Sequence, residues 1–269
     1  MNTILCILGG IFCLNIFVTP IIEHKASYHP KKTIESTPKQ IKLPYEDIFL
    51  KTADGKKING WYLDNPKSDT VILHFHGNTG NMSTYLNRIS SYYKIPSDVF
   101  VIDYHGFGKS EGAISDQTLY MDVQAAYSFL IKKKYKPNQI MVIGVSMGGI
   151  AAAELAATQK IAGVIIIATL SSAKDVFEQH VPFFLQPFIW INSTYNVTEK
   201  IKKISAPILF IHAKDDKLLP YKMALKNYQN AKEPKYLITA DGGHYDMRLS
   251  TEQKAKYVEF IKTGKILSH

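Results

Sequence analysis

The chain has 269 residues, 46% of them hydrophobic and 12% aromatic, and its 32 basic and 23 acidic side chains give a formal net charge of +9. This length and apolar content are enough for one large core, so we expect one folded domain. The two cysteines are Cys6 and Cys13. Residues 23 to 269 therefore contain no disulfide, no thiolate metal site and no cysteine nucleophile.

The basic residues are scattered, with short runs only at Lys56 to Lys57 and Lys132 to Lys134. Proteins that bind nucleic acid concentrate such residues on one face or in one stripe. We therefore interpret most of the lysines as solvated surface residues and predict no nucleic-acid partner. The positive charge suits an anionic membrane surface instead.

The first 22 residues form the most apolar part of the sequence, and no charged side chain occurs from Asn2 to Ile22. About 20 apolar residues are enough to cross a bilayer as a helix. We therefore predict a single-pass N-terminal anchor in residues 1–22 and a membrane localisation. The alternative is a cleaved signal peptide, which would give a secreted or periplasmic protein. However, no Lys or Arg precedes the apolar run and no small-x-small cleavage site follows it.

Residues 23–44 have no apolar periodicity and are predicted to be a linker to a domain at 45–269. Within that domain, stretches of strand and helix character alternate. The expected strands are 45–50, 58–63, 70–75, 99–103, 140–143, 163–167, 207–212 and 235–239, and the expected helices are 83–93, 116–134, 147–157, 221–231 and 251–261. The first two strands flank an Ala53-Asp54-Gly55 turn and are predicted to form an antiparallel hairpin. The remaining alternation predicts an α/β fold with a mostly parallel central sheet flanked by helices.

The interval from about residue 170 to 204 interrupts the alternation and is rich in aromatic residues. We interpret it as a short cap insertion over the carboxyl edge of the sheet, where ligands bind in open α/β sheets. Phe183, Phe184, Phe188 and Trp190 are the candidates for an apolar substrate pocket. The alternative is that these side chains only pack the cap onto the domain.

The strongest local motif is Gly144-Val145-Ser146-Met147-Gly148, which follows an apolar run and precedes a helix-forming run. A GxSxG pattern in this context is typical of a nucleophile elbow, a serine on a sharp strand-to-helix turn. The two glycines remove side chains that would clash where the chain crowds itself. Ser146 is therefore the candidate nucleophile.

A serine hydroxyl needs a base to take its proton and a third group to orient that base. In this kind of fold the chain order is serine, acid, histidine. Asp215 and Asp216 follow strand 207–212, and His244 lies in a glycine-containing loop after strand 235–239. We predict His244 as the base and Asp216 as the acid, because Asp216 lies at the expected distance before Pro220. Asp215 is the alternative acid.

Two backbone N–H groups should stabilise the negative charge that develops on a carbonyl oxygen under attack. We predict those of Met147 and Asn78. His74 and His76 near Asn78 raise the alternative of a zinc site, but the loop adds no further Asp-His pair and the chain has no HExxH motif. We therefore predict no metal and no cofactor, and interpret His74 as a core histidine and His76 as a partner of the oxyanion loop.

Together these motifs resemble the α/β-hydrolase superfamily and, within it, the membrane-anchored Bem46-like group, which includes the α/β-hydrolase domain-containing proteins 12, 13 and 17. The matching strings are His74 to Asn81, Asp103 to Gly112, Gly144 to Gly149, His212 to Pro220 and Gly243-His244. The resemblance implies the same triad and oxyanion donors, an N-terminal membrane anchor, and ester or thioester substrates that are often lipids or S-acylated proteins. His105 departs from the resemblance, because many relatives have arginine at that point.

These observations predict a serine hydrolase that cleaves an acyl ester or thioester, of a lipid or other acylated small molecule, through an acyl-enzyme on Ser146. A serine peptidase or amidase of the same fold is one alternative, and it would need an acidic or polar pocket for a peptide amine. A non-catalytic binding protein is another. A scaffold has no physical need for an intact Ser, Asp and His with both oxyanion segments, which argues against that alternative.

Overall fold

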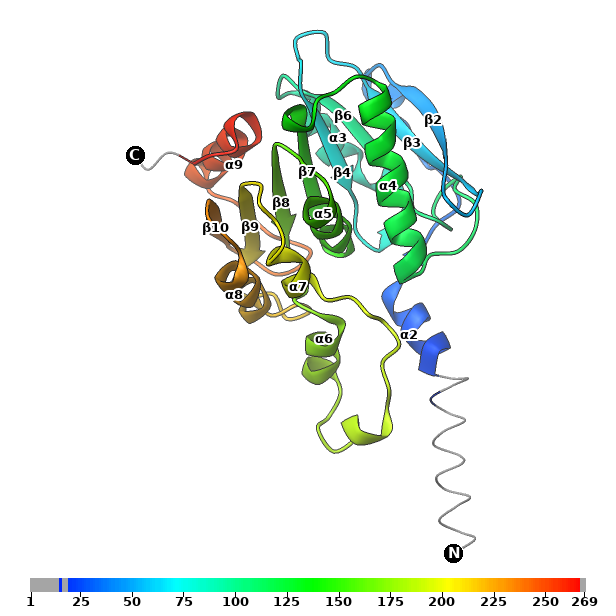
Figure 1. Cartoon of the computed structure of the whole chain (residues 1–269), viewed down its shortest axis with the longest axis vertical. Coiled ribbons are helices and arrows are strands. Elements are labelled where there is room, and N and C mark those ends of the chain that lie inside the picture. The colour runs from blue at the N-terminus through cyan, green and yellow to red at the C-terminus, as the bar shows by residue number, and fades with distance from the viewer. Residues whose placement is uncertain (1–14, 16–18, 267–269) are drawn as a thin grey trace, which may run out of the picture.

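The described part of the chain, residue 15 and residues 19–266 of a computed structural model, is built around one sheet. Its strands lie in the order β10-β9-β8-β7-β4-β6-β3-β2 (Figure 1). The strands are β2 (Glu46–Lys51), β3 (Lys57–Leu63), β4 (Val71–Phe75), β6 (Asp98–Ile102), β7 (Ile140–Val145), β8 (Gly163–Ile167), β9 (Ile208–Ala213) and β10 (Lys235–Ala240). β3 runs antiparallel to β2 and β6, and every other pairing is parallel. The predicted mostly parallel sheet and its N-terminal hairpin are confirmed.

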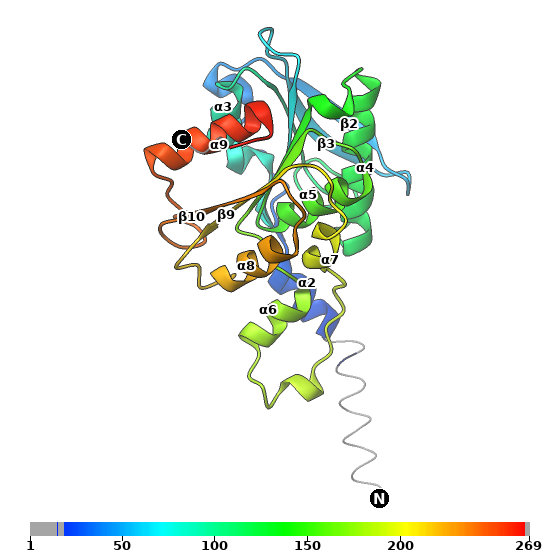
Figure 2. The same cartoon turned by 60° about the vertical axis from the view of Figure 1, so that its left-hand side comes forward.

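Helices cover both faces of this sheet (Figures 1 and 2). They are α3 (Leu86–Tyr93), α4 (Asp116–Lys132), α5 (Met147–Thr158), α7 (Val197–Ile201), α8 (Tyr221–Asn230) and α9 (Thr251–Thr263), whereas α6 (Ala173–His180) lies beyond the end of the sheet. Alternate side chains of a strand point to opposite faces. In β4, Val71, Leu73 and Phe75 accordingly join the core under α4, α5 and α7, whereas Ile72 joins the core under α3 and α9.

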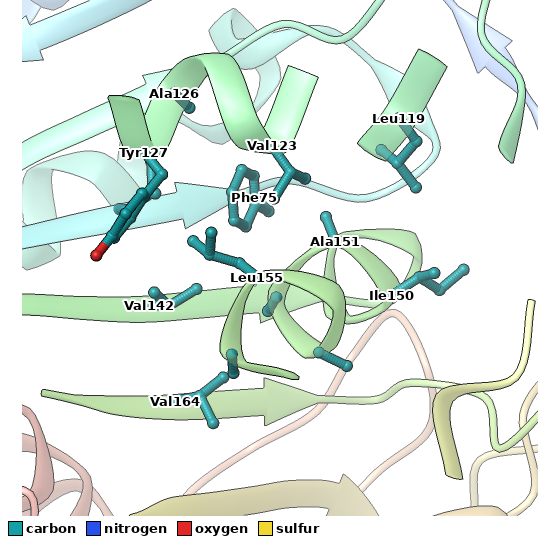
Figure 3. Close-up of a cluster of buried hydrophobic side chains, with 14 of the residues drawn as sticks. Phe75, Leu119, Val123, Ala126, Tyr127, Val142, Ile150, Ala151, Leu155 and Val164 are labelled. Carbon is teal, nitrogen blue, oxygen red and sulfur yellow. The ribbon is translucent and has the colours of Figure 1, made fainter. Parts of the chain in front are cut away.

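Helix α5 lies at the centre of the core that it forms with α4, α7 and one face of the sheet, and it is buried over most of its length. Figure 3 shows Ala151 and Leu155 of α5 facing Phe75 of β4 and Val123 of α4. The alanines on α5 let it approach the sheet and α4 closely, because they carry no side chain beyond Cβ. The first residue of α5 directly follows Ser146, so this packing also fixes where the serine lies.

The helix predicted at 83–93 is shorter than expected. A 3-10 helix, η3 (Met82–Tyr85), precedes α3. The Asn81 side chain accepts a hydrogen bond from Ser83 N, and it thereby caps η3. This local side-chain bond competes with a continuous α-helix.

Residues 23–44, predicted as a linker, lie against the domain. They include most of α2 (Thr19–Ser27), a two-residue strand β1 (His29–Pro30) that pairs in parallel with β5 (Thr79–Gly80), and a 3-10 helix η2 (Pro38–Ile41). Within residues 15 and 19–266, no helix is both long and apolar enough to span a bilayer. Most of the anchor predicted at 1–22 lies outside the described residues, so it stays a prediction.

The turn after β6 contains His105, which is buried between two carboxylates. Its Nδ1 lies 2.6 Å from Asp122 Oδ1, its backbone N donates to Asp122 Oδ2 at 2.8 Å, and its Nε2 lies 3.2 Å from Asp54 Oδ2. Burial alone lowers the pKa of His105, but the two carboxylates outweigh it and raise that pKa overall. Burial also raises the pKa of Asp122, against the lowering effect of His105. Both ring nitrogens of His105 face a carboxylate oxygen, and a neutral imidazole could donate from only one of them, so we assign a charged pair.

A histidine whose pKa is raised by folding stabilises the fold fully below its unfolded pKa, about 6.5, and loses that contribution as the pH rises through its folded pKa. His105→Gln is therefore expected to lower the free energy of unfolding by about 3 kcal/mol at pH 6, and by less at pH 9. Urea unfolding at the two pH values measures this difference. His29→Gln, at an exposed histidine, is the control. An equal loss at both pH values would show that His105 is not charged in the fold.

Candidate active site

Ser146 lies between β7 and α5 in a conformation that non-glycine residues rarely adopt, with φ 53° and ψ −117°. Close packing enforces this turn. A Cβ at Gly144 would collide with the Gly148 carbonyl, and a Cβ at Gly148 would collide with the Phe75 carbonyl at the end of β4. The turn is further held by Ser146 N, which donates to Ile167 O at 2.8 Å. The glycine spacing noted in the sequence thus has the steric origin expected of a nucleophile elbow.

The serine hydroxyl meets a histidine and an aspartate from two other loops. Ser146 Oγ lies 3.1 Å from His244 Nε2, and His244 Nδ1 lies 2.8 Å from Asp216 Oδ2. Asp216 follows β9 and His244 follows β10, so three parallel strands deliver the three side chains to one edge of the sheet. Asp215 is exposed, whereas Asp216 is buried and bonded to His244. The geometry therefore favours Asp216 of the two carboxylates.

The Asp216 carboxylate receives more hydrogen bonds than the histidine alone supplies. Leu218 N and Leu219 N donate to Oδ1 at 2.9 and 2.8 Å. His212, at the end of β9, places its Nε2 3.2 Å from Oδ2 and 2.7 Å from Leu219 O. Burial raises the pKa of Asp216, but the bonds from His212, His244 and Leu219 outweigh it and hold that pKa well below its usual value. An ionised carboxylate fixes the His244 ring with Nδ1–H toward it and Nε2 toward the serine.

Sequence reasoning did not find the role of His212. The sequence places it four residues before the acid at the end of a buried strand. It is 1% exposed. Only the fold of the loop brings its ring back to Asp216.

The two segments predicted to supply the oxyanion donors lie next to the serine. Met147 is the first residue of α5, and N–H groups in the first turn of a helix have no intrahelical partner. Asn78 lies in the loop after β4, and a Cβ added at its neighbour Gly77 would lie 3.8 Å from Ser146 Cβ. The loop is thus close to the nucleophile. The positive end of the α5 dipole adds to the stabilisation of an anion there.

A segment of the predicted linker, residues 27–35, fastens the Asn78 loop, and we call it the N-terminal strap. Asn78 Nδ2 donates to Ser27 O and His29 N donates to Asn78 O, both at 2.8 Å. Farther along, Lys31 N donates to Gly80 O at 2.8 Å. Asn81 Nδ2 donates to the carbonyls of Lys31 and Thr33 at 3.0 and 2.7 Å. The position of the loop beside Ser146 therefore depends on a segment that precedes the predicted domain.

His76 also helps to hold the loop that contains Asn78. Its Nδ1 lies 2.7 Å from Gly77 O and its Nε2 lies 3.1 Å from Asp103 Oδ1, and the ring is fully buried. His74 is also fully buried, and burial lowers its pKa well below the usual value. No group of three or more His, Cys, Asp or Glu side chains among residues 15 and 19–266 is arranged to hold a metal ion.

The four aromatic residues predicted to line a pocket lie on the cap between α6 and α7. Phe183 is 82% exposed, Phe184 60%, Phe188 51% and Trp190 49%. Phe183 and Phe184 are therefore surface side chains of the cap, and Phe188 and Trp190 are half exposed. The substrate pocket predicted from these four residues stays a prediction.

Comparison with known proteins agrees with this fold. Residues 66–195 match a family model described as serine aminopeptidase, S33. The Escherichia coli protein YfhR is 30% identical over 87% of this chain and 84% of its own length, and protein bem46 of Schizosaccharomyces pombe is 32% identical over 68% and 64%. Among solved structures, the Pyrococcus furiosus esterase Pf2001 superposes with a TM-score of 0.71 at 24% identity, covering 87% of this chain and 98% of the esterase.

An eight-stranded sheet with a serine elbow after β7 is the architecture of the α/β-hydrolases. With the sequence matches, this chain belongs to the α/β-hydrolase superfamily and to its Bem46-like group. The resemblance found in the motifs is thereby confirmed.

His212→Leu is expected to lower kcat for ester hydrolysis about tenfold with little change in KM, because the ring positions Asp216 and does not touch substrate. His212→Asn, which keeps a side-chain donor, should recover part of the loss. Steady-state kinetics of the two variants and circular dichroism of both proteins test this. A rise in KM as large as the fall in kcat, or equal kcat values for the two variants, would contradict a positioning role.

Removal of the N-terminal strap is expected to slow ester hydrolysis by one to two orders of magnitude, since small displacements of catalytic groups have effects of that size. The comparison is between residues 23–269, which keep the strap, and residues 37–269, which lack it. Both proteins should retain the same far-ultraviolet circular dichroism per residue. Equal kcat/KM in the two folded proteins would show that the strap does not hold the loop.

Proposed function

We propose that this protein is a serine hydrolase that cleaves acyl esters or thioesters through an acyl-enzyme on Ser146. The observation that carries the proposal is the continuous chain of contacts from Ser146 Oγ through His244 to the ionised, buried Asp216. His244 Nε2 takes the proton of Ser146 as Oγ attacks the substrate carbonyl. The N–H groups of Met147 and Asn78 stabilise the negative charge of the tetrahedral intermediate.

Collapse of that intermediate breaks the bond to the leaving group. His244 returns the proton to the leaving alcohol or thiol, and the acyl group stays on Ser146. A water molecule then attacks the acyl carbon while His244 takes its proton. The bond between Ser146 Oγ and the acyl carbon breaks, His244 returns the proton to Oγ, and the acid leaves. Asp216 stays ionised throughout and stabilises the imidazolium that forms twice in each cycle.

One protein of the same fold, Pf2001, is named an esterase, and its likeness to this chain extends to the fold alone. The family model carries the description of an aminopeptidase, so cleavage of an amide is the second candidate function. An apolar N-terminal segment and a net charge of +9 support attachment to a membrane, where acyl lipids and S-acylated proteins are found.

Labelling with a fluorophosphonate probe tests for an activated serine. The full chain is expected to label at Ser146. Ser146→Ala should not label, and His244→Ala should label at least a hundredfold more slowly, because the base is missing. Ser91→Ala, at an exposed serine on α3, should label like the parent. A folded parent that stays unlabelled would favour a non-catalytic protein.

Substrates with the same acyl group and either an ester or an amide bond distinguish the two candidate functions. We expect kcat/KM for the ester to be the larger by several orders of magnitude. Comparable values for an amide with a free α-amine would establish the aminopeptidase instead.

A further inference from the structure

The tip of the cap carries a cluster of exposed apolar side chains, Phe183, Phe184, Leu185 and Phe188, which we call the aromatic tip. No charged residue occurs between Val181 and Ile191. Single exposed apolar residues are common on protein surfaces, but a contiguous group of large ones marks a surface that meets another apolar phase. Figures 1 and 2 show α6 and the short helix η5 (Gln186–Phe188) projecting away from the sheet at the same end of the molecule as α2.

The cap is fastened to the beginning of the chain. Asn15 is 2% exposed. Its Nδ2 donates to Phe188 O at 2.8 Å, and its Oδ1 accepts from Trp190 N at 2.6 Å. Eight residues later, the Glu23 carboxylate accepts from Asn192 N and Ser193 N at 2.8 and 2.9 Å. The cap therefore contacts the N-terminal segment at both of these points, and the aromatic tip adjoins the contact with Asn15.

The residues on the two sides of Asn15 differ in polarity. From Ile4 to Leu14 every residue is apolar or glycine, whereas Glu23 is the first charged residue of the chain. A polar side chain inside an apolar membrane segment needs a hydrogen-bonding partner. The cap backbone at Phe188 and Trp190 supplies both the acceptor and the donor for Asn15. The aromatic tip thus adjoins Asn15, which directly follows the part of the sequence that is suited to a bilayer.

We propose that the aromatic tip is a second membrane contact, inserted into the interface of a bilayer that contains anionic lipid. Phe and Leu side chains of interfacial segments are buried at the boundary between lipid headgroups and acyl chains, and the net charge of +9 favours an anionic surface. The cap and the N-terminal segment then hold the protein at the membrane together. This inference rests on the proposed membrane attachment, but it does not depend on the role of Ser146.

The two tryptophans of the chain provide a direct measurement. Trp190 is half exposed beside Asn15, whereas Trp61 is fully buried on β3. The full chain is reconstituted in vesicles of phosphatidylcholine and phosphatidylglycerol that carry brominated acyl chains, which quench nearby tryptophans. We expect roughly half of the emission to be lost, because only Trp190 reaches the lipid. In Trp190→Phe the remaining emission should be unquenched.

A variant with Phe183, Phe184 and Phe188 all changed to Ser separates the tip from the N-terminal segment. It keeps Trp190 and residues 1–22, so it should still float with the vesicles. Quenching of Trp190 should fall at least twofold, because the cap no longer inserts. Phe49→Ser is the matched control, since Phe49 is a similarly exposed phenylalanine on β2. It should leave quenching unchanged.

Three results would overturn the proposal. One is a parent chain that does not float with the vesicles, which would refute membrane attachment as well. Another is unchanged Trp190 quenching in the triple variant. The third is a parent that sediments as a dimer where the triple variant is a monomer, because the tip would then cover a second copy of the chain. Fluorophosphonate labelling of the same samples reports on the serine site separately, so a failure of the proposed catalysis is distinguishable.

Discussion

The arrangement of the site depends on one close approach, that of the first turn of α5 to the end of β4. Gly148 lies against the Phe75 carbonyl with no room for a Cβ, and Gly144 lies in the same way against Gly148. This contact forces Ser146 into its left-handed conformation and places it beside the loop that follows β4. The alanines and Leu155 of α5, buried against β4 and α4, provide the packing that offsets the strain. The nucleophile and the oxyanion loop are thus positioned by the same packing.

Asp216, the acid of the triad, has more polar surroundings than Ser146 has at the first turn of α5. Asp216 is buried, yet it remains ionised because two backbone N–H groups and the rings of His212 and His244 surround its oxygens. An unpaired carboxylate at the same depth would take up a proton, and it would then no longer orient His244 by accepting a hydrogen bond from Nδ1. The loop after β9 is therefore folded around the charge of one side chain. Ser146, which is only half buried, remains accessible to a substrate.

Features set by neighbours in sequence were predictable. The strand and helix alternation predicted the sheet, and the glycine spacing around Ser146 predicted the turn, because both follow from local sterics and periodicity. The order of Ser146, Asp216 and His244 predicted their meeting, since parallel strands end at one edge. The strap, His212 and the tie between Asn15 and the cap were not predictable. Each depends on hydrogen bonds between segments far apart in the chain, for which no residue pattern exists. The exposure of the aromatic residues of the cap could not be predicted either. Aromatic residues are expected in a substrate pocket, in a packed interface and on a binding surface alike, so composition does not distinguish these three roles.

The most direct test of the central claim is to trap the acyl-enzyme. The full chain is mixed with a p-nitrophenyl acyl ester, quenched in acid within the first turnover and digested for mass spectrometry. The account predicts a burst of nitrophenol of about one equivalent per chain, and the acyl mass on the peptide that contains Ser146. An acyl group on any other residue, or undiminished turnover by Ser146→Ala, would contradict it.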